Sequence, residues 1–141
     1  MWHDRRVPHP VQLIHATSPS ASTEYASAAV VAAGTRLIFL AGACPLNVDG
    51  TTAAPGDYAG QAAACLRTMA QALSDSGAGI RDVVSTRILV ASDERADLST
   101  VWQVVREAFG DHDVPSTLLG VTVLGYDGQL VEIEAIAALA D

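Results

Sequence analysis

Two carboxylates near the end of the chain, Glu132 and Glu134, alternate with apolar residues over 130–136. Successive side chains of a β-strand point to opposite faces. This spacing therefore puts both carboxylates on one face, about 7 Å apart, and sends the apolar residues to the other face. Two like charges so close together are mildly unfavourable unless water or a cation meets them. The pattern predicts either a solvated strand edge or a site that binds water or a cation.

Other residue types that bind metals or act as nucleophiles show no useful spacing. Cys44 and Cys65 fit no metal-binding pattern and are too few for a disulfide framework, so we interpret them as reduced structural thiols. His112 stands in a polar turn, where we expect it to be solvated. We expect no metal site from the remaining histidines, which are His3, His9 and His15.

The composition limits the class of protein. A chain of 141 residues, of which 50% are hydrophobic, fits one compact domain. A formal net charge of −8, with only 8 scattered Lys and Arg residues, argues against a surface that follows nucleic-acid phosphates. No apolar run approaches the ~18 residues of a membrane span, and the first residues lack the apolar core of a signal peptide. We therefore expect a cytoplasmic protein that binds neither nucleic acid nor membrane.

Hydrophobic periodicity and turn residues predict strands and helices along the chain. Gly34-Thr35 indicates a β-hairpin between the second and third strands. One helix begins after the N-cap Asp57 and ends near Ser76, and a second follows an apolar stripe over 98–109 up to Gly110. The expected strands are Val11–His15, Tyr25–Ala33, Arg36–Gly42, Val83–Ala91, Thr117–Val123 and Leu130–Leu139. The expected organisation is an arm with a short strand over 1–16, then a single domain over 17–141 that opens with a loop at 17–23.

This order, βββαβαββ, indicates an α+β fold in which two helices cover one face of a mixed sheet of five or six strands. Alternation assigns to the helix-covered face Val84, Ile88, Val90, Leu119, Val121, Val131 and Ile133. It assigns to the other face Val83, Arg87, Leu89, Leu118, Leu130, Ile136 and both glutamates. That second face is too apolar to stay wet, so we expect an oligomer that buries it and brings the carboxylates into or beside a subunit interface.

A series of motifs resembles the Rid (RidA/YjgF) family over roughly residues 20–139. The motifs are Tyr25, the run LAGACP at 40–45, DVV at 82–84, EAFGDH at 107–112 and VEIEAIA at 131–137. The second is similar to the family's S-G-Q-x-P and the last to its V-E-I-E-A-x-A. The resemblance implies a chorismate-mutase-like homotrimer with clefts between its subunits.

Deaminating members of that family hydrolyse reactive enamines and imines, such as 2-aminoacrylate and its imine, to a 2-keto acid and ammonia. They need no cofactor and no metal. By resemblance, Glu132 positions the water that attacks the imine carbon. The resemblance also assigns to the substrate cleft Tyr25, the backbone groups of Gly42 and Cys44, and Gln103, which matches an asparagine of the second helix.

The chain departs from the family pattern at the position that binds the substrate carboxylate. The family's P-A-R-[ST] aligns with residues 114–117, so Ser116 stands where the family has an arginine. A neutral hydroxyl cannot replace a guanidinium fork, which implies weaker selection of an anionic imino acid. Ala43 likewise replaces a glutamine. Arg87, on the face of the carboxylates, either binds substrate in compensation or pairs with Glu134.

Two functions stay open on these observations. The first is a cofactor-free hydrolase or deaminase of a small reactive enamine, imine or related metabolite, different from a typical 2-aminoacrylate deaminase. The alternative is a non-catalytic trimeric module that binds a small molecule or has a regulatory role. Ribonuclease activity, which is ascribed to some relatives, fits poorly with the acidic charge.

Overall fold

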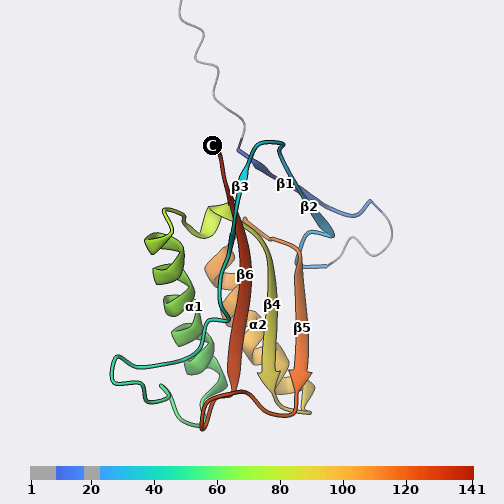
Figure 1. Ribbon diagram of the computed structural model, residues 1–141. Coiled ribbons are helices and arrows are strands. Elements are labelled where there is room, and N and C mark those ends of the chain that lie inside the picture. Colours follow the sequence, from blue (N-terminus) through green and yellow to red (C-terminus); the bar gives the residue numbers. More distant parts are fainter. Residues whose placement is uncertain (1–8, 18–22) are drawn as a thin grey trace, which may run out of the picture.

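Two helices back a mixed β-sheet, and their order along the chain is the predicted one (Figure 1). The computed structural model describes residues 9–17 and 23–141, so the start of the predicted arm and most of the predicted loop at 17–23 lie outside the described residues. The strands are β1 (Val11–Ile14), β2 (Ala28–Val31), β3 (Arg36–Phe39), β4 (Val83–Ala91), β5 (Ser116–Val121) and β6 (Val131–Leu139). The helices are α1 (Tyr58–Asp75) and α2 (Arg95–Phe109), and a short 3₁₀ turn, η1 (Ile80–Asp82), leads into β4.

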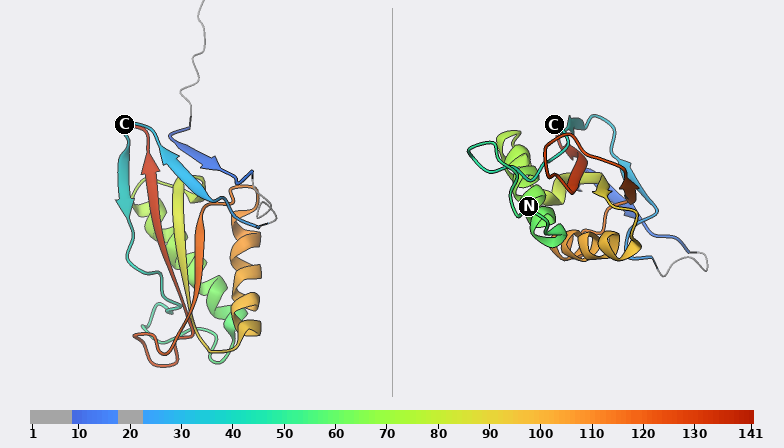
Figure 2. Two further views of the ribbon diagram at one scale, coloured as in Figure 1. Left: turned by 90° about the vertical axis from the view of Figure 1, so that its right-hand side faces the viewer. Right: turned by 90° about the horizontal axis from the view of Figure 1, so that it is seen from below.

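The main sheet has four strands in the order β3-β6-β4-β5. In it, β6 pairs antiparallel with both β3 and β4, while β4 pairs parallel with β5. β1 and β2 form a separate antiparallel pair. The six predicted strands are therefore present but divided between two sheets, and both helices lie on one side of the main sheet (Figure 2).

The predicted hairpin between the second and third strands is wrong. β2 pairs with β1, whereas β3 pairs with β6. Gly34, with a φ of 79°, does turn the chain between them, and the Thr35 hydroxyl donates to the Ala32 carbonyl there. A turn sets the direction of the chain but does not select the partner of the next strand. Here β3 pairs with β6, whose alternate residues are buried in the core, and completes that edge of the sheet.

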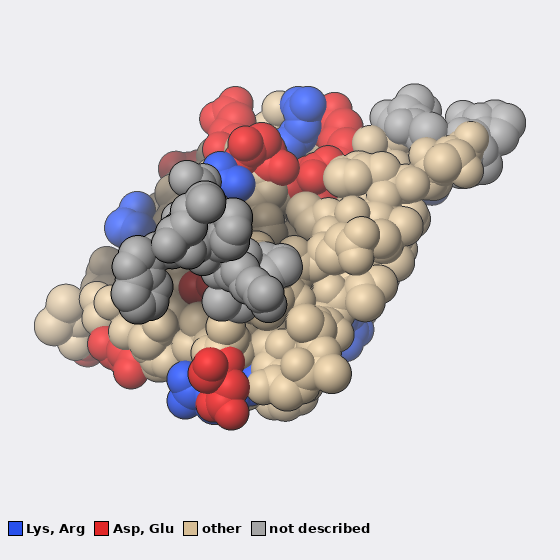
Figure 3. Space-filling view, turned by 90° about the horizontal axis from the view of Figure 1, so that it is seen from above, with Lys and Arg blue, Asp and Glu red and all other residues tan. Residues whose placement is uncertain are grey.

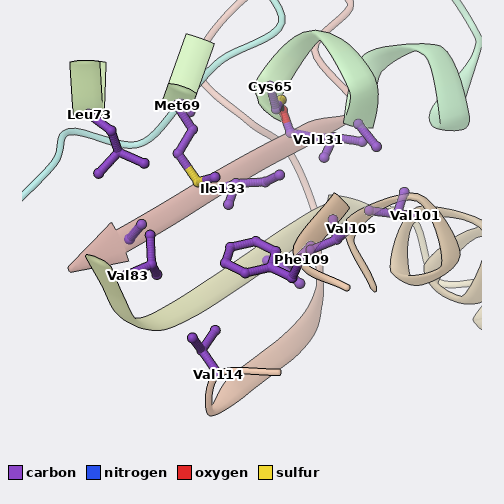
Figure 4. Packing of buried hydrophobic residues seen from close by; sticks show 14 of the residues in the cluster. Cys65, Met69, Leu73, Val83, Val101, Val105, Phe109, Val114, Val131 and Ile133 are labelled. Carbon is purple, nitrogen blue, oxygen red and sulfur yellow. Dashed lines mark hydrogen bonds between the residues drawn. The ribbon is translucent and has the colours of Figure 1, made fainter. Parts of the chain in front are cut away.

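The helix boundaries confirm the predicted caps. The Asp57 carboxylate accepts a hydrogen bond from the Gly60 N–H at 3.0 Å at the start of α1, and Gly110, with a positive φ of 58°, follows the end of α2. The buried residues of both helices pack against β4 and β6 in one core (Figure 4). They include Cys65, Met69 and Leu73 of α1 and Val101, Val105 and Phe109 of α2.

A bulge in β4 reverses one predicted facing. Val83 is opposite Ala137 and Ser85 is opposite Ile136, so Val84 is an extra residue in its strand. As a result Val83 is fully buried and Val84 only partly buried, opposite to the prediction. Period-two counting cannot detect an inserted residue.

In β5 the predicted facing is also wrong. Leu118 is opposite the buried Ile88 and packs against the core, whereas Leu119 is opposite Leu89 on the other face. The strand contains no charged residue that would mark its solvent side, so the sequence leaves its phase undetermined. The predicted alternation holds in β6, where Val131 and Ile133 are fully buried.

His112 is buried, contrary to the prediction of a solvated turn. Its Nε2 lies 2.8 Å from the carbonyl oxygen of Val83. Because Gly110 turns the chain back from α2 toward the start of β4, the imidazole enters the core edge and meets a backbone partner there.

Charged side chains are unevenly distributed over the surface. Seen from above, the right-hand side, where Figure 1 shows β1, β2 and β5, is mostly uncharged (Figure 3). These strands contain no Asp, Glu, Lys or Arg. Among the described residues, neither helix combines the length and the apolar character that crossing a membrane requires.

Candidate functional site

A backbone bridge brings the segment after β3 beside β6. The N–H of Ala43 donates to the carbonyl of Ile133 at 2.7 Å, and the N–H of Ile133 donates to the carbonyl of Ala43 at 3.1 Å. Ala43 and Ile133 are both buried. The neighbours of Ala43, Gly42 and Cys44, therefore meet Glu132, the neighbour of Ile133.

Glu132 has different surroundings at its two carboxylate oxygens. Its Oε1 accepts hydrogen bonds from the Cys44 thiol, at 3.1 Å, and from the Gln129 amide Nε2, at 3.2 Å. Its Oε2 lies over the backbone of Gly42, where a Cβ would stand only 2.5 Å away. A side chain at position 42 would displace the carboxylate, so glycine is required there for contact with Glu132.

The thiol of Cys44 stays protonated at neutral pH. Burial, the hydrogen bond to Glu132 and the negative charge of Glu132 raise the pKa of Cys44 to about 11, although the Gln129 amide lowers it somewhat. Burial also raises the pKa of Cys65, whose thiol donates to the Val131 carbonyl at 3.3 Å. Both cysteines are free, and Cys44 contributes a hydrogen-bond donor to a carboxylate at the site.

A groove lies beside this cluster on the sheet face away from the helices. It has a volume of about 280 Å³, and Gly42 and Arg87 both line it. Arg87 Nη1 lies 3.5 Å from Glu134 Oε2, and the two side chains are 57% and 40% exposed. An ion pair this exposed contributes little stability. Arg87 therefore makes the expected contact with Glu134 and still lies in the groove.

Tyr25 and Ser116 lie in a second cleft. Its lining has no charged side chain and consists of Tyr25, Trp102, Ser116, Thr117 and Leu118. The rings of Tyr25 and Trp102 meet edge to face, with 5.9 Å between centroids. The Ser116 hydroxyl is 2.7 Å from that of Thr86, a residue that lines the groove described above. Ser116, at the position of the family arginine, thus forms a hydrogen bond with Thr86 of the neighbouring strand β4.

The predicted site residues therefore fall into separate places. Glu132, Gly42 and Cys44 are in contact, Arg87 shares the groove with Gly42, and Tyr25 and Ser116 share the uncharged cleft. Gln103 lies exposed on α2, across the sheet from Glu132, and lines neither cleft.

Gln129 and Trp102 are among the residues of these clusters that were not predicted as site residues. Gln129 precedes Glu132 within a turn, where no periodicity indicates the direction of a side chain. Trp102 belongs to the apolar stripe of α2, and the sequence gives no sign of its contact with Tyr25.

Within residues 9–17 and 23–141, no group of three or more His, Cys, Asp and Glu side chains is arranged to hold a metal ion. Two of the three N-terminal histidines lie near single carboxylates: His9 is 3.5 Å from Asp82 and His15 is 2.9 Å from Asp113. His3 lies outside the described residues.

The chain is similar to one known family and to several solved structures. A family model described as Endoribonuclease L-PSP matches residues 15–139. YyfB from Yersinia pestis, a Rid-family protein of unknown function, is 26% identical with a TM-score of 0.82; the match covers 92% of this chain and 99% of that one. Rv2704 from Mycobacterium tuberculosis, of the YjgF/YER057c/UK114 family, is 30% identical with a TM-score of 0.63, over 92% and 99% of the two chains. No curated protein sequence matches the chain significantly.

The Cys44 thiol should report the charge of Glu132. Because the Glu132 carboxylate raises the pKa of Cys44, Glu132→Gln should lower that pKa, increase the thiolate fraction at pH 8, and speed alkylation of Cys44 by about threefold or more. Iodoacetamide labelling followed by peptide mass spectrometry separates Cys44 from Cys65. Glu134→Gln removes the same charge without touching Cys44 and should leave the rate unchanged. Equal rates in wild type and Glu132→Gln would contradict the contact.

Proposed function

Because the chain belongs to the YjgF/Rid family, whose family model is described as Endoribonuclease L-PSP, we propose that it is a cofactor-free hydrolase that deaminates a small enamine, imine or related metabolite. One observation carries the proposal. The Glu132 carboxylate lies against the bare backbone of Gly42, and no donor of the described residues bonds its Oε2. In the proposal, this oxygen accepts the proton of the attacking water.

The proposed reaction needs only water and a base. The Glu132 carboxylate accepts a proton from a water molecule as the water oxygen bonds to the imine carbon; the π pair of the C=N bond moves to nitrogen, which takes that proton back from Glu132. The resulting carbinolamine then expels ammonia and leaves a carbonyl. Gly42 leaves room for the Glu132 carboxylate to pack against the backbone, and in the proposal the substrate reaches it from the adjoining groove, which Gly42 lines.

The lining of the cleft that contains Tyr25 and Ser116 supports a substrate other than 2-aminoacrylate. The cleft with Tyr25 and Ser116 has no charged lining residue, and the Ser116 hydroxyl is already 2.7 Å from that of Thr86. No guanidinium lines this cleft to pair with a substrate carboxylate. We therefore propose a substrate whose recognition in this cleft relies on the aromatic pair of Tyr25 and Trp102 and on hydroxyl groups.

We further propose that the complete site forms between subunits of a homotrimer. Tyr25 is 37% exposed and lies in its own cleft, while Phe39, beside Gly42 in the groove, is 72% exposed. Apolar side chains so exposed at both places favour burial against another copy of the chain. In this proposal the cleft of one subunit faces the Glu132 cluster of the next, and the site lies in the cytoplasm.

The two alternative functions are a non-catalytic binding module and a ribonuclease. A non-catalytic binding module would use the same clefts and is favoured by the absence of an arginine at Ser116. The ribonuclease activity named in the family description is not carried over to this chain, because a net charge of −8 opposes binding of a phosphate backbone.

The assembly has a direct test. The protein should behave in solution as a trimer of about 44 kDa, three times the chain mass of 14.6 kDa, because its exposed apolar groups need cover. Light scattering coupled to size exclusion measures this mass. A stable monomer at micromolar concentration would contradict the proposed site between subunits.

The role of Glu132 has a test by substitution. Glu132→Gln keeps the size of the side chain but removes the base, so turnover should fall by about 10²-fold or more. Imines generated in situ by an amino-acid oxidase serve as substrates, and semicarbazide trapping measures how fast the protein removes them. Glu134→Gln is the matched control and should retain activity. Undiminished turnover in Glu132→Gln would exclude the hydrolase mechanism, and a wild type inactive on every imine would favour the binding module.

The role of position 116 has a separate test. Wild-type hydrolysis of 2-aminoacrylate should be weak, and Ser116→Arg should increase it by about tenfold, because the guanidinium supplies a charge-assisted pair to the substrate carboxylate. Ser116→Gln adds a long side chain without charge and should not increase the rate. Wild-type activity equal to that of an arginine-bearing relative would show that Ser116 does not limit this reaction.

A further inference from the structure

The two oxygens of the Glu132 carboxylate differ in their hydrogen bonds: one accepts two, and the other accepts none from the described residues. Both of its donors, the Cys44 thiol and the Gln129 amide, bond Oε1, at 3.1 and 3.2 Å. Two bonds fill the lone pairs of that oxygen. Oε2 accepts no bond from any described residue and lies over the Gly42 backbone. The two oxygens are therefore not equivalent.

The orientation of Gln129 is set by its own partners. The side chain is only 4% exposed, and its Oε1 lies 3.1 Å from the backbone N–H of Tyr126, which can only donate. The amide nitrogen must then face the other way, where it donates to the Val131 carbonyl at 3.0 Å and to Glu132. A flipped amide would place its NH2 group against the Tyr126 N–H at one end and its oxygen against two acceptors at the other. Gln129 is a fixed donor to Glu132.

Cys44 acts on the same oxygen from the other side. Because its thiol remains protonated, the sulfur can donate to the carboxylate across the neutral pH range. Its alternative acceptor, the Gly42 carbonyl, is farther away at 3.5 Å, against 3.1 Å for Glu132 Oε1. The shorter contact and the negative charge of the carboxylate favour the bond to Glu132.

We infer that Gln129 and Cys44 are positioning residues that fix Glu132 through Oε1, so that Oε2 is the oxygen that takes the proton of the attacking water. This inference rests on the proposed hydrolase function. Without the two donors the carboxylate can rotate about its Cγ–Cδ bond. Oε2 then occupies the position required for proton transfer for only part of the time. Neither residue touches the substrate in this arrangement.

The test compares substitutions that remove or keep each donor. Gln129→Leu and Cys44→Ala remove a donor, whereas Cys44→Ser keeps one. Gln61→Leu is the matched control: Gln61 is also buried and also ties down the turn before β6, through the Gly128 carbonyl and the Leu130 N–H, but does not touch Glu132. Each protein is assayed for removal of imines generated in situ by an amino-acid oxidase, and crystal structures are determined for the wild type and for the double variant Gln129→Leu/Cys44→Ala.

If the inference is correct, Gln129→Leu and Cys44→Ala each lower kcat by about tenfold with little change in KM, the size of effect expected for a hydrogen bond to a charged group. Cys44→Ser keeps most of the activity, and Gln61→Leu loses stability without an equal loss of kcat. A loss of kcat as large in Gln61→Leu would show that anchoring of the turn, and not the contact with the carboxylate, is responsible, and would overturn the inference. If Gln129→Leu fails to fold, the comparison of Cys44→Ala with Cys44→Ser decides.

The crystal structures separate this inference from the proposed function. We expect one carboxylate orientation in the wild type and a rotated or divided one in the double variant, whether or not any imine is hydrolysed. A carboxylate that keeps its place without both donors would refute the positioning role. A wild type that holds the carboxylate but hydrolyses no imine would refute the proposed function and leave the positioning intact.

Discussion

Burial of alternate residues in β6 is the constraint on which the rest of the structure depends. Val131, Ile133 and Ala137 are sealed between the sheet and the helices, while Glu132 and Glu134 point to the other face. A slip of one residue would bring two carboxylates into the core, where an unpaired charge is very costly. The register of β6 is therefore fixed more firmly than backbone hydrogen bonds alone would fix it, and both neighbouring strands take their positions from it.

The candidate site follows from this register through backbone contacts. The bridge between Ala43 and Ile133 places Gly42 and Cys44 beside Glu132, and the pairing with β4 places Arg87 opposite Glu134. The sheet pairing alone therefore positions Glu132. Gly42 leaves space for its carboxylate, and Cys44 and Gln129 donate hydrogen bonds to Oε1. Such a site needs little dedicated structure.

The sequence predicts the parts of this arrangement that depend on local spacing. The helix ends follow from Asp57 and Gly110, and the facing of Glu132 follows from its alternation with Val131 and Ile133. Pairing of β2 with β1, the extra residue at Val84 and the phase of β5 depend on contacts distant in sequence, so local patterns cannot supply them. The site contacts of Gln129 and Trp102 cannot be predicted for the same reason, because local patterns do not report tertiary contacts. The departure at Ser116 is visible only by comparison with the family motif.

The position of β6 within the sheet also affects how the protein can be made. This strand follows all the others in the chain, yet it lies between β3 and β4. Until β6 joins the sheet, β3 lacks its partner and the β4 edge that β6 covers is unpaired. Unpaired strand edges of this kind promote aggregation. The chain is therefore most prone to pair with other chains during the interval in which β6 has not yet joined the sheet.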